Sequence, residues 1–249
     1  MPSSTSPVRR SVRTASLIPL ALRFLASSGY GAARRLRNLS LAFLVSVTPA
    51  LADPLTLVAL GDSLTQGYGL PEGEGLVPQL QAWLTERGED VTVVNAGVSG
   101  DTTAGGAARI DWTLTDDVDA LMIALGGNDV LRGLPPAEAR ANLTAMLEAA
   151  TAHGLPVLLV GIAAPGNYGP DYKAEFEAIY PDLAARYGAI LFDNLLAPLT
   201  ERDDGAATLR DLMQTDGIHP NAAGVAMIVE ALGPHVLELL KITKERDPA

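Results

Sequence analysis

LTLVALGDSLT, residues 55–65, joins a short apolar run directly to a turn made of small and polar residues. The run Leu55–Leu60 is shorter than a typical core helix and predicts a buried strand. Gly61 permits a sharp turn after that strand, and Ser63 stands where a following helix would begin. This abrupt change from apolar to polar residues predicts that the strand ends where the sheet meets solvent. The segment after the strand is therefore a candidate functional site.

On either side of this stretch, short apolar runs alternate with longer amphipathic ones. Strands separated by helices imply right-handed βαβ units and a parallel sheet. We therefore expect one domain over residues 53–249, an α/β protein with a three-layer α/β/α fold and a parallel five-stranded sheet. Further strands are predicted at Val91–Asn95, Ala120–Leu125, Val157–Val160 and Ala189–Phe192. Helices are predicted at Val77–Arg87, from a cap at Asp101–Thr103 through Arg109, at Pro135–Ala152, at Asp171–Tyr187, and at Pro220–Leu240, where Gly233-Pro234 favours a bend.

Small and polar residues gather after three of the predicted strands and before the last predicted helix. In open parallel sheets, ligands bind outside the carboxyl ends of the strands. These four segments are therefore where a functional site is expected. They are Gly61–Thr65, Asn95–Gly100, Gly126–Asp129 and Asp216–Pro220.

His219 is the best candidate for a catalytic base among the three histidines of the chain. His153 closes a predicted helix, where a C-terminal cap is expected, and His235 lies within the last helix, exposed or packed. Asp216 stands three residues before His219, so a tight turn can bring its carboxylate to the imidazole Nδ1. That contact would fix the tautomer and stabilise the imidazolium. Helix capping alone is the alternative for this pair.

Ser63 is the candidate nucleophile, because a helix N-terminus favours a nascent alkoxide through its free N–H groups and dipole. A plain N-cap is its alternative, and Asp62 is interpreted as a structural turn and cap residue. The segment does not match the G-x-S-x-G elbow of α/β-hydrolases. Gly97 offers an unobstructed N–H and Asn128 a side-chain amide, although both are also common turn residues.

Together, the four segments resemble the motif blocks of the GDSL, or SGNH, hydrolase superfamily. The blocks are G-D-S-L-T at 61–65, N-A-G-V-S-G-D-T-T at 95–103, G-G-N-D at 126–129 and D-G-I-H-P at 216–220. The resemblance covers essentially residues 55–240. It is strongest toward bacterial arylesterases and the periplasmic acyl-CoA thioesterase and lysophospholipase type, to which Gly166–Gly169 and Ala178–Pro181 are also similar.

This resemblance implies a flavodoxin-like sheet of strand order 2-1-3-4-5. It implies Ser63, His219 and Asp216 as a catalytic triad, with an oxyanion hole made by the N–H groups of Ser63 and Gly97 and the side chain of Asn128. The implied activity is hydrolysis of carboxylic esters and thioesters through an acyl-enzyme, with a small-molecule acyl ester or thioester as partner. No cofactor is expected, since the chain has no cysteine and no His/Asp/Glu cluster spaced for a metal.

Apolar residues in the loops after the third and fourth predicted strands are the candidate substrate-binding residues. Because sugar-stacking aromatics are scarce there, an acyl chain is the better guest for such a surface. Trp83 and Trp112 are both assigned to packing rather than to substrate. The candidates are Leu131, Leu134, Pro165 and Tyr168.

Two other functions compete with this interpretation. A carbohydrate O-deacetylase could use the same scaffold. A flavin- or phosphate-binding module would use a loop containing Ser63, Thr65 and Gly67. That second alternative gives no role to Asp216 and His219, and it offers only Tyr68 as a stacking aromatic in the first two loops.

The N-terminal segment, residues 1–52, has the composition of a secretory signal. It contains seven arginines and no acidic residue, and Arg34, Arg35 and Arg37 precede the apolar run 39–47 and an Ala50-Leu51-Ala52 end. These features predict cleavage after Ala52 and a periplasmic or secreted product without a stable membrane anchor. An uncleaved anchor is the alternative. The added length of residues 1–33 also admits a misassigned start codon or a twin-arginine signal at Arg9-Arg10.

The remainder of the chain is strongly acidic. Without residues 1–52 it keeps 11 basic and 29 acidic residues, a net charge of −18. A surface of that sign repels phosphate backbones, which argues against nucleic acid as a partner. We expect a monomer.

Overall fold

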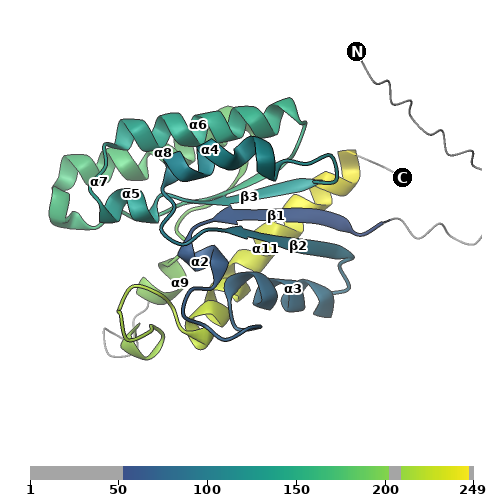
Figure 1. Ribbon diagram of the computed structural model, residues 1–249, viewed down its shortest axis with the longest axis horizontal. Coiled ribbons are helices and arrows are strands. Elements are labelled where there is room, and N and C mark those ends of the chain that lie inside the picture. Colours follow the sequence, from purple (N-terminus) through teal and green to yellow (C-terminus); the bar gives the residue numbers. More distant parts are fainter. Residues whose placement is uncertain (1–52, 202–208, 247–249) are drawn as a thin grey trace, which may run out of the picture. The chain divides into compact units, whose positions relative to one another are not determined.

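The structure is a computed structural model that describes residues 53–201 and 209–246. Contacts divide the chain into two units, and the second begins at Ala52. The predicted signal segment 1–52 lies outside the described residues. In the second unit, five parallel strands form one sheet in the order β2-β1-β3-β4-β5, as predicted (Figure 1). The strands are β1 (Leu55–Gly61), β2 (Val91–Gly97), β3 (Ala120–Ala124), β4 (Val157–Val160) and β5 (Ile190–Phe192).

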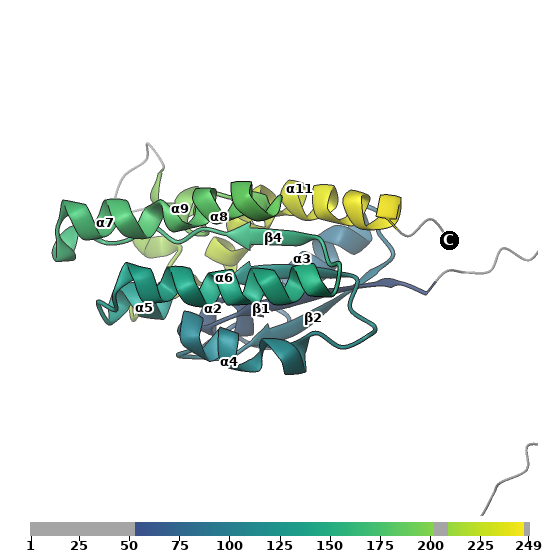
Figure 2. The same cartoon turned by 90° about the horizontal axis from the view of Figure 1, so that it is seen from above.

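Helices cover both faces of the sheet, so the three-layer prediction is confirmed (Figure 2). One layer contains α4 (Thr103–Thr113), α5 (Gly127–Leu131), α6 (Pro136–Ala152), α7 (Pro170–Glu177) and α8 (Ile179–Tyr187), and a short 3₁₀ turn, η1 (Gly166–Tyr168), precedes α7. The other layer contains α2 (Ser63–Gln66), α3 (Leu76–Glu86), α9 (Ala197–Thr200) and α11 (Ala222–Arg246).

Alternation along the strands builds a separate core on each face. On β1, Leu57 and Ala59 pack in the cluster that contains α3 and α11. Their neighbours Val58 and Leu60 pack in the cluster that contains α4, α6 and α8. The strand is therefore apolar on both faces, as expected for a parallel sheet covered by two helical layers.

Strand register brings the carboxyl ends of the three central strands to one level. Gly61 at the end of β1 pairs with Gly97 on β2 and with Ala124 on β3. The segments that follow these strands therefore emerge side by side. This places Ser63 near both the β2 loop and the helix that carries Asn128.

α11 is the one helix in the described residues that is long and apolar enough to cross a membrane by length and composition. Its apolar face, including Leu232, Val236 and Leu239, is buried in the core under the sheet. This packing identifies α11 as the core helix of a globular domain.

The structure differs from the sequence-based expectations in three places. Trp112 does not pack: its side chain is 87% exposed, because the buried positions of α4 are Thr103, Gly106 and Ile110 and Trp112 points away from that face. The predicted helix Asp171–Tyr187 is two helices that meet at Ala178. Helix α5, which begins at Gly127 within the segment Gly126–Asp129, was not predicted, and a turn was only the alternative for Asn128.

Candidate active site

Ser63 is the first residue of α2, directly beyond the end of β1. The turn requires Gly61, because a Cβ there would lie 1.9 Å from Thr65 Oγ1. Asp62 is the N-cap, and its side chain accepts a hydrogen bond from the Leu64 N–H at 3.0 Å. This short connection lets the first turn of α2 fold back over the strand and holds Ser63 at the edge of the sheet.

His219 is held by a turn that Asp216 organises. Asp216 Oδ1 accepts from the backbone N–H groups of Ile218 at 2.9 Å and His219 at 3.0 Å, and Gly217 supplies the left-handed backbone with φ 69°. The other oxygen, Oδ2, lies 2.6 Å from His219 Nδ1. The local contacts therefore leave only the second imidazole nitrogen free to face the sheet.

That second nitrogen meets the serine. His219 Nε2 lies 2.8 Å from Ser63 Oγ, although the two residues are 156 positions apart in the chain. A continuous hydrogen-bonded series thus runs from the Asp216 carboxylate through the imidazole to the Ser63 hydroxyl. The three residues that the sequence singled out as nucleophile, base and orienting carboxylate come together.

The electrostatics of this series suit a base. Hydrogen bonds from the His219 backbone, the His219 side chain and the Ile218 backbone lower the pKa of Asp216 to about 2. Asp216 is therefore a carboxylate at neutral pH, and an acceptor of that kind favours the tautomer with the proton on Nδ1. The lone pair on Nε2 is then available to the Ser63 hydroxyl.

Gly97 and Asn128 lie at the same edge of the sheet. The Gly97 N–H donates to Asn95 Oδ1 at 2.9 Å. A Cβ at Gly97 would lie 2.3 Å from the Gln66 backbone nitrogen, so α2 packs directly on this glycine. Asn128 Nδ2 donates to the Asp101 carbonyl at 2.9 Å, with Asp62 Oδ2 at 3.4 Å. Both candidate oxyanion donors thus have partners within the protein in this structure.

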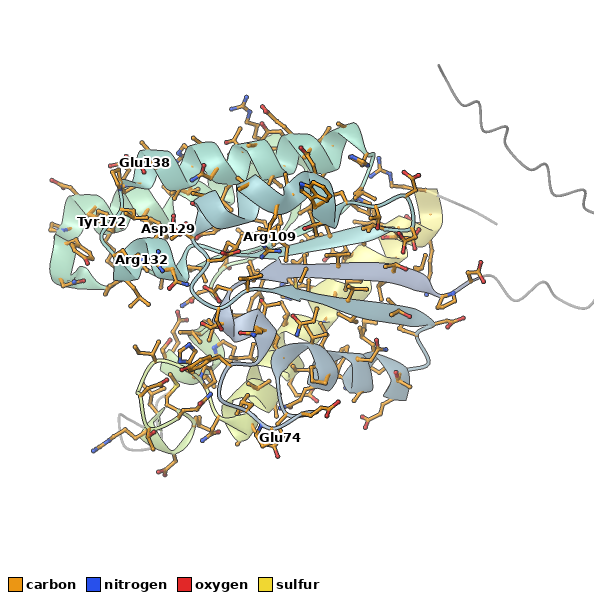
Figure 3. All side chains as sticks on the ribbon, in the orientation of Figure 1. Glu74, Arg109, Asp129, Arg132, Glu138 and Tyr172 are labelled. Atoms are coloured by element: carbon orange, nitrogen blue, oxygen red, sulfur yellow. The ribbon has the colours of Figure 1, made fainter. Side chains whose placement is uncertain are left out.

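A second layer of polar contacts supports these loops, and it was not predicted from the sequence. Asp129 is 1% exposed and accepts from the Thr103 N–H at 2.8 Å and from its hydroxyl at 2.6 Å. Arg109, on α4 beside the end of β1, binds Asp101 at 2.8 Å and the Gly61 carbonyl at 3.0 Å (Figure 3). The available signal was that Asp129 and Thr103 both lie inside motif blocks.

The predicted substrate-binding residues form a group of their own beside α5. Leu131 is 55% exposed, and the Tyr168 hydroxyl donates to the Leu131 carbonyl at 3.3 Å. The Tyr172 hydroxyl similarly holds the Leu134 carbonyl at 2.9 Å. Pro165 is exposed just before η1.

A different set of residues lines the hollow that touches Ser63 and His219. It has a cavity volume of about 10 Å³, room for about one water molecule. None of the four predicted substrate-binding residues contributes to it. Its apolar lining includes Leu64, Tyr68, Leu70, Leu76, Leu195 and Ile228.

Apolar side chains are also exposed on the loops around the site. The Tyr68 ring lies 4.9 Å from the His219 ring at an interplanar angle of 41°, and no catalytic-site role was assigned to Tyr68 from the sequence. An apolar substrate could cover such side chains near the nucleophile. They are Tyr68, Val98 and Ile218.

Comparisons with known proteins agree with this geometry. A family model described as GDSL-like lipase/acylhydrolase matches residues 59–227, which span all four motif segments. Esterase TesA from Pseudomonas aeruginosa is 41% identical over 74% of this chain and 89% of its own length. Thioesterase 1/protease 1/lysophospholipase L1 from Escherichia coli K12 is 33% identical over 82% of this chain and 93% of its own. The crystal structure of AlinE4, an SGNH-hydrolase family esterase, matches with a TM-score of 0.61 at 41% identity and covers 77% of this chain and 99% of that one.

Proposed function

The chain belongs to the GDSL-like lipase/acylhydrolase family and is an ester-hydrolysing enzyme, and we propose that it cleaves carboxylic esters and thioesters through a Ser63–His219–Asp216 triad. The observation that carries the proposal is the unbroken series of contacts from Asp216 Oδ2 to His219 and from His219 to Ser63 Oγ, at 2.6 and 2.8 Å. Such a series is the arrangement that activates a serine hydroxyl.

The reaction begins when Ser63 Oγ attacks the acyl carbon and passes its proton to His219 Nε2. The tetrahedral intermediate collapses as the bond to the alcohol or thiol breaks, and the imidazolium returns the proton to that leaving group. A water molecule then attacks the acyl-Ser63 ester, with His219 again taking a proton. Release of the carboxylic acid restores the Ser63 hydroxyl, and the Asp216 carboxylate stabilises the imidazolium in both halves.

The negative oxygen of each tetrahedral intermediate needs donors. The N–H of Ser63 at the start of α2, the Gly97 N–H and the Asn128 amide are the groups that we assign to it. The adjacency of Gly61, Gly97 and Ala124 in the sheet supports this, because it sets the three loops at one level. Donors of this kind act mainly in the transition state, where charge develops on the oxygen.

The substrate class follows from the surface around Ser63. Exposed apolar side chains such as Tyr68, Val98 and Ile218 favour an acyl chain over a sugar. The names of the relatives, esterase and thioesterase/lysophospholipase, support the same class. A carbohydrate O-deacetylase remains a distinct outcome that the assay below detects.

The test compares Ser63→Ala with Ser99→Ala. Ser99 lies on the β2 loop, where its hydroxyl contacts Gln66 rather than a histidine. With a p-nitrophenyl ester series, an acyl thioester and an acetylated sugar, we expect wild type and Ser99→Ala to hydrolyse the first two, and Ser63→Ala to be inactive. An organophosphonate should add its mass to wild type and not to Ser63→Ala. Full turnover by purified Ser63→Ala would overturn the mechanism, and a preference for the acetylated sugar would overturn the substrate class.

We also infer that the protein is exported. The basic, apolar and A-x-A features of residues 1–52 support a signal peptide that is removed after Ala52. The enzyme would then act in the periplasm or outside the cell, as an acidic domain without its basic leader.

A further inference from the structure

We propose that Asp62 is a positioning residue that fixes the orientation of the Asn128 amide toward the oxyanion. This inference rests on the proposed function, since it assigns Asp62 a role in the same oxyanion hole. It differs from the interpretation of Asp62 as a cap alone. One buried side chain would then connect the helix that carries the nucleophile with the helix that carries the side-chain donor.

The two carboxylate oxygens of Asp62 make contacts to two different elements. Oδ1 accepts from the Leu64 N–H at 3.0 Å and caps α2. Oδ2 lies 3.4 Å from Asn128 Nδ2 on α5. The side chain is 3% exposed, so neither contact is replaced by bulk water. A shift of either helix would disturb the contact to the other.

The chemistry of both neighbours determines which end of the Asn128 amide faces them. An ionised carboxylate and a backbone carbonyl can only accept hydrogen bonds. With the Asp62 carboxylate on one side and the Asp101 carbonyl at 2.9 Å on the other, only the NH₂ group of Asn128 satisfies both. A flipped amide would set its own oxygen against two acceptors. The Asp62 carboxylate and the Asp101 carbonyl thus orient the Asn128 side chain so that its NH₂ group, rather than its oxygen, faces them.

The unequal lengths of these contacts suit a donor that must serve a third partner. The 2.9 Å bond to Asp101 has ordinary length, whereas the 3.4 Å contact to Asp62 exceeds the usual range of about 2.7–3.2 Å. The second proton of the amide is therefore weakly engaged. It is therefore available to an oxyanion when the intermediate forms, while the Asp101 bond keeps the amide plane in place.

Capping alone does not account for a carboxylate at this position. Asn and Ser cap helices about as well as Asp, and they do so without a buried charge. Burial raises the pKa of Asp62 to about 6, with the Leu64 N–H and the charge of His219 acting in the opposite direction. A neutral cap would avoid that penalty. A role toward Asn128 accounts for the acceptor-only group that is present.

The test uses Asp62→Asn. The amide oxygen of the introduced side chain can still cap Leu64, but its NH₂ group would face the Asn128 NH₂ group, donor against donor. We expect a folded protein whose kcat falls at least about tenfold, part of the ~10²–10³ that one oxyanion donor contributes, with KM within about twofold of wild type. In an Asn128→Ala background the same change should have little further effect, because its target is gone.

Two variants make the result interpretable. Asp119→Asn removes a carboxylate that binds the Thr56 N–H at 2.7 Å near the start of β1, and it should leave kcat unchanged. Should Asp62→Asn fail to fold, Asp62→Ser carries the same test, since it keeps a cap and loses the contact to Asn128. Wild-type kcat in the folded Asp62 variant, or a loss that persists in full in the Asn128→Ala background, would overturn the proposal. Failure of the proposed function would instead show in wild type and Ser63→Ala, before any Asp62 variant is compared.

Discussion

Substitution of Asn128 separates a role in transition-state stabilisation from a role in folding. If its amide stabilises the oxyanion, Asn128→Ala should lower kcat by ~10²–10³ and change KM little. Asn128→Asp should be worse, because it can place a negative charge beside a developing one. The measurement is kcat for both variants at a temperature where circular dichroism shows each to be folded. Near-wild-type kcat in either variant would show that backbone N–H groups alone stabilise the oxyanion.

Asp62 should also be visible in the pH dependence of stability. Its pKa rises from 3.8 unfolded to about 6 folded, so between these values the folded state binds more protons than the unfolded state. Stability therefore falls as pH rises through this window. Relative to Asp62→Asn, wild type should lose ~3 kcal/mol of unfolding free energy between about pH 4 and about pH 7. Parallel urea titrations at several pH values check this, and curves that stay parallel across the window would contradict it.

How much of the site was predictable depended on how local each contact is. Asp216 and His219 lie three residues apart around a glycine turn, so the sequence alone indicated their pairing. Ser63 and His219 are 156 residues apart, and only the motif resemblance joined them. The Asp62–Asn128 contact depends on side-chain orientation between two helices, which no spacing in the sequence records.

At the scale of elements, strands were easier to predict than helix boundaries. All five strands were found because each is a short apolar run, buried on both faces when central. α5 was missed because it begins at Gly127 after Gly126, and glycine disfavours helices by roughly 1 kcal/mol relative to alanine. α7 and α8 were merged because one continuous pattern covers both. Their break at Ala178 is marked only by Pro181 in the first turn of α8, which has no N–H to donate to the Glu177 carbonyl four residues earlier.

The contact of α11 with α3 gives a prediction about two opposing effects. A Cβ at Gly233 would lie 2.5 Å from the Trp83 ring, so the helices pack through this glycine. Alanine improves helix propensity by about 1 kcal/mol, whereas forcing a methyl group into a packed core costs about 1–3 kcal/mol. We expect Gly233→Ala to be destabilised on balance, with kcat unchanged because the contact is remote from Ser63.

Urea denaturation of Gly233→Ala measures this balance, and Gly166→Ala is the matched control. A methyl group added at Gly166 would meet nothing within 4 Å, and the backbone there is not left-handed. Adding Trp83→Leu to Gly233→Ala should make the glycine substitution less harmful than it is alone. If Gly233→Ala has the same free energy of unfolding as wild type, the Trp83 indole can move to accommodate the added methyl group without loss of stability.

At the scale of the whole molecule, charge divides the chain in two. Residues 1–52 carry seven arginines, and the rest carries a net charge of −18. We expect the exported protein to begin at Asp53, two residues before β1 starts at Leu55. Intact mass spectrometry of protein recovered from the native host checks this. An active protein that retains residues 1–52 would contradict cleavage after Ala52.

The 156-residue separation between Ser63 and His219 also bears on when the enzyme becomes active. The nucleophile leaves the ribosome early and the base near the end of synthesis, so no nascent chain that stops short of residue 219 can contain the complete series. Long-range contacts of this kind form late in folding, after loop closure has been overcome. Hydrolysis thus reports completion of the native topology. A chain kept unfolded on its way out of the cytosol would be harmless to the acyl esters and thioesters there.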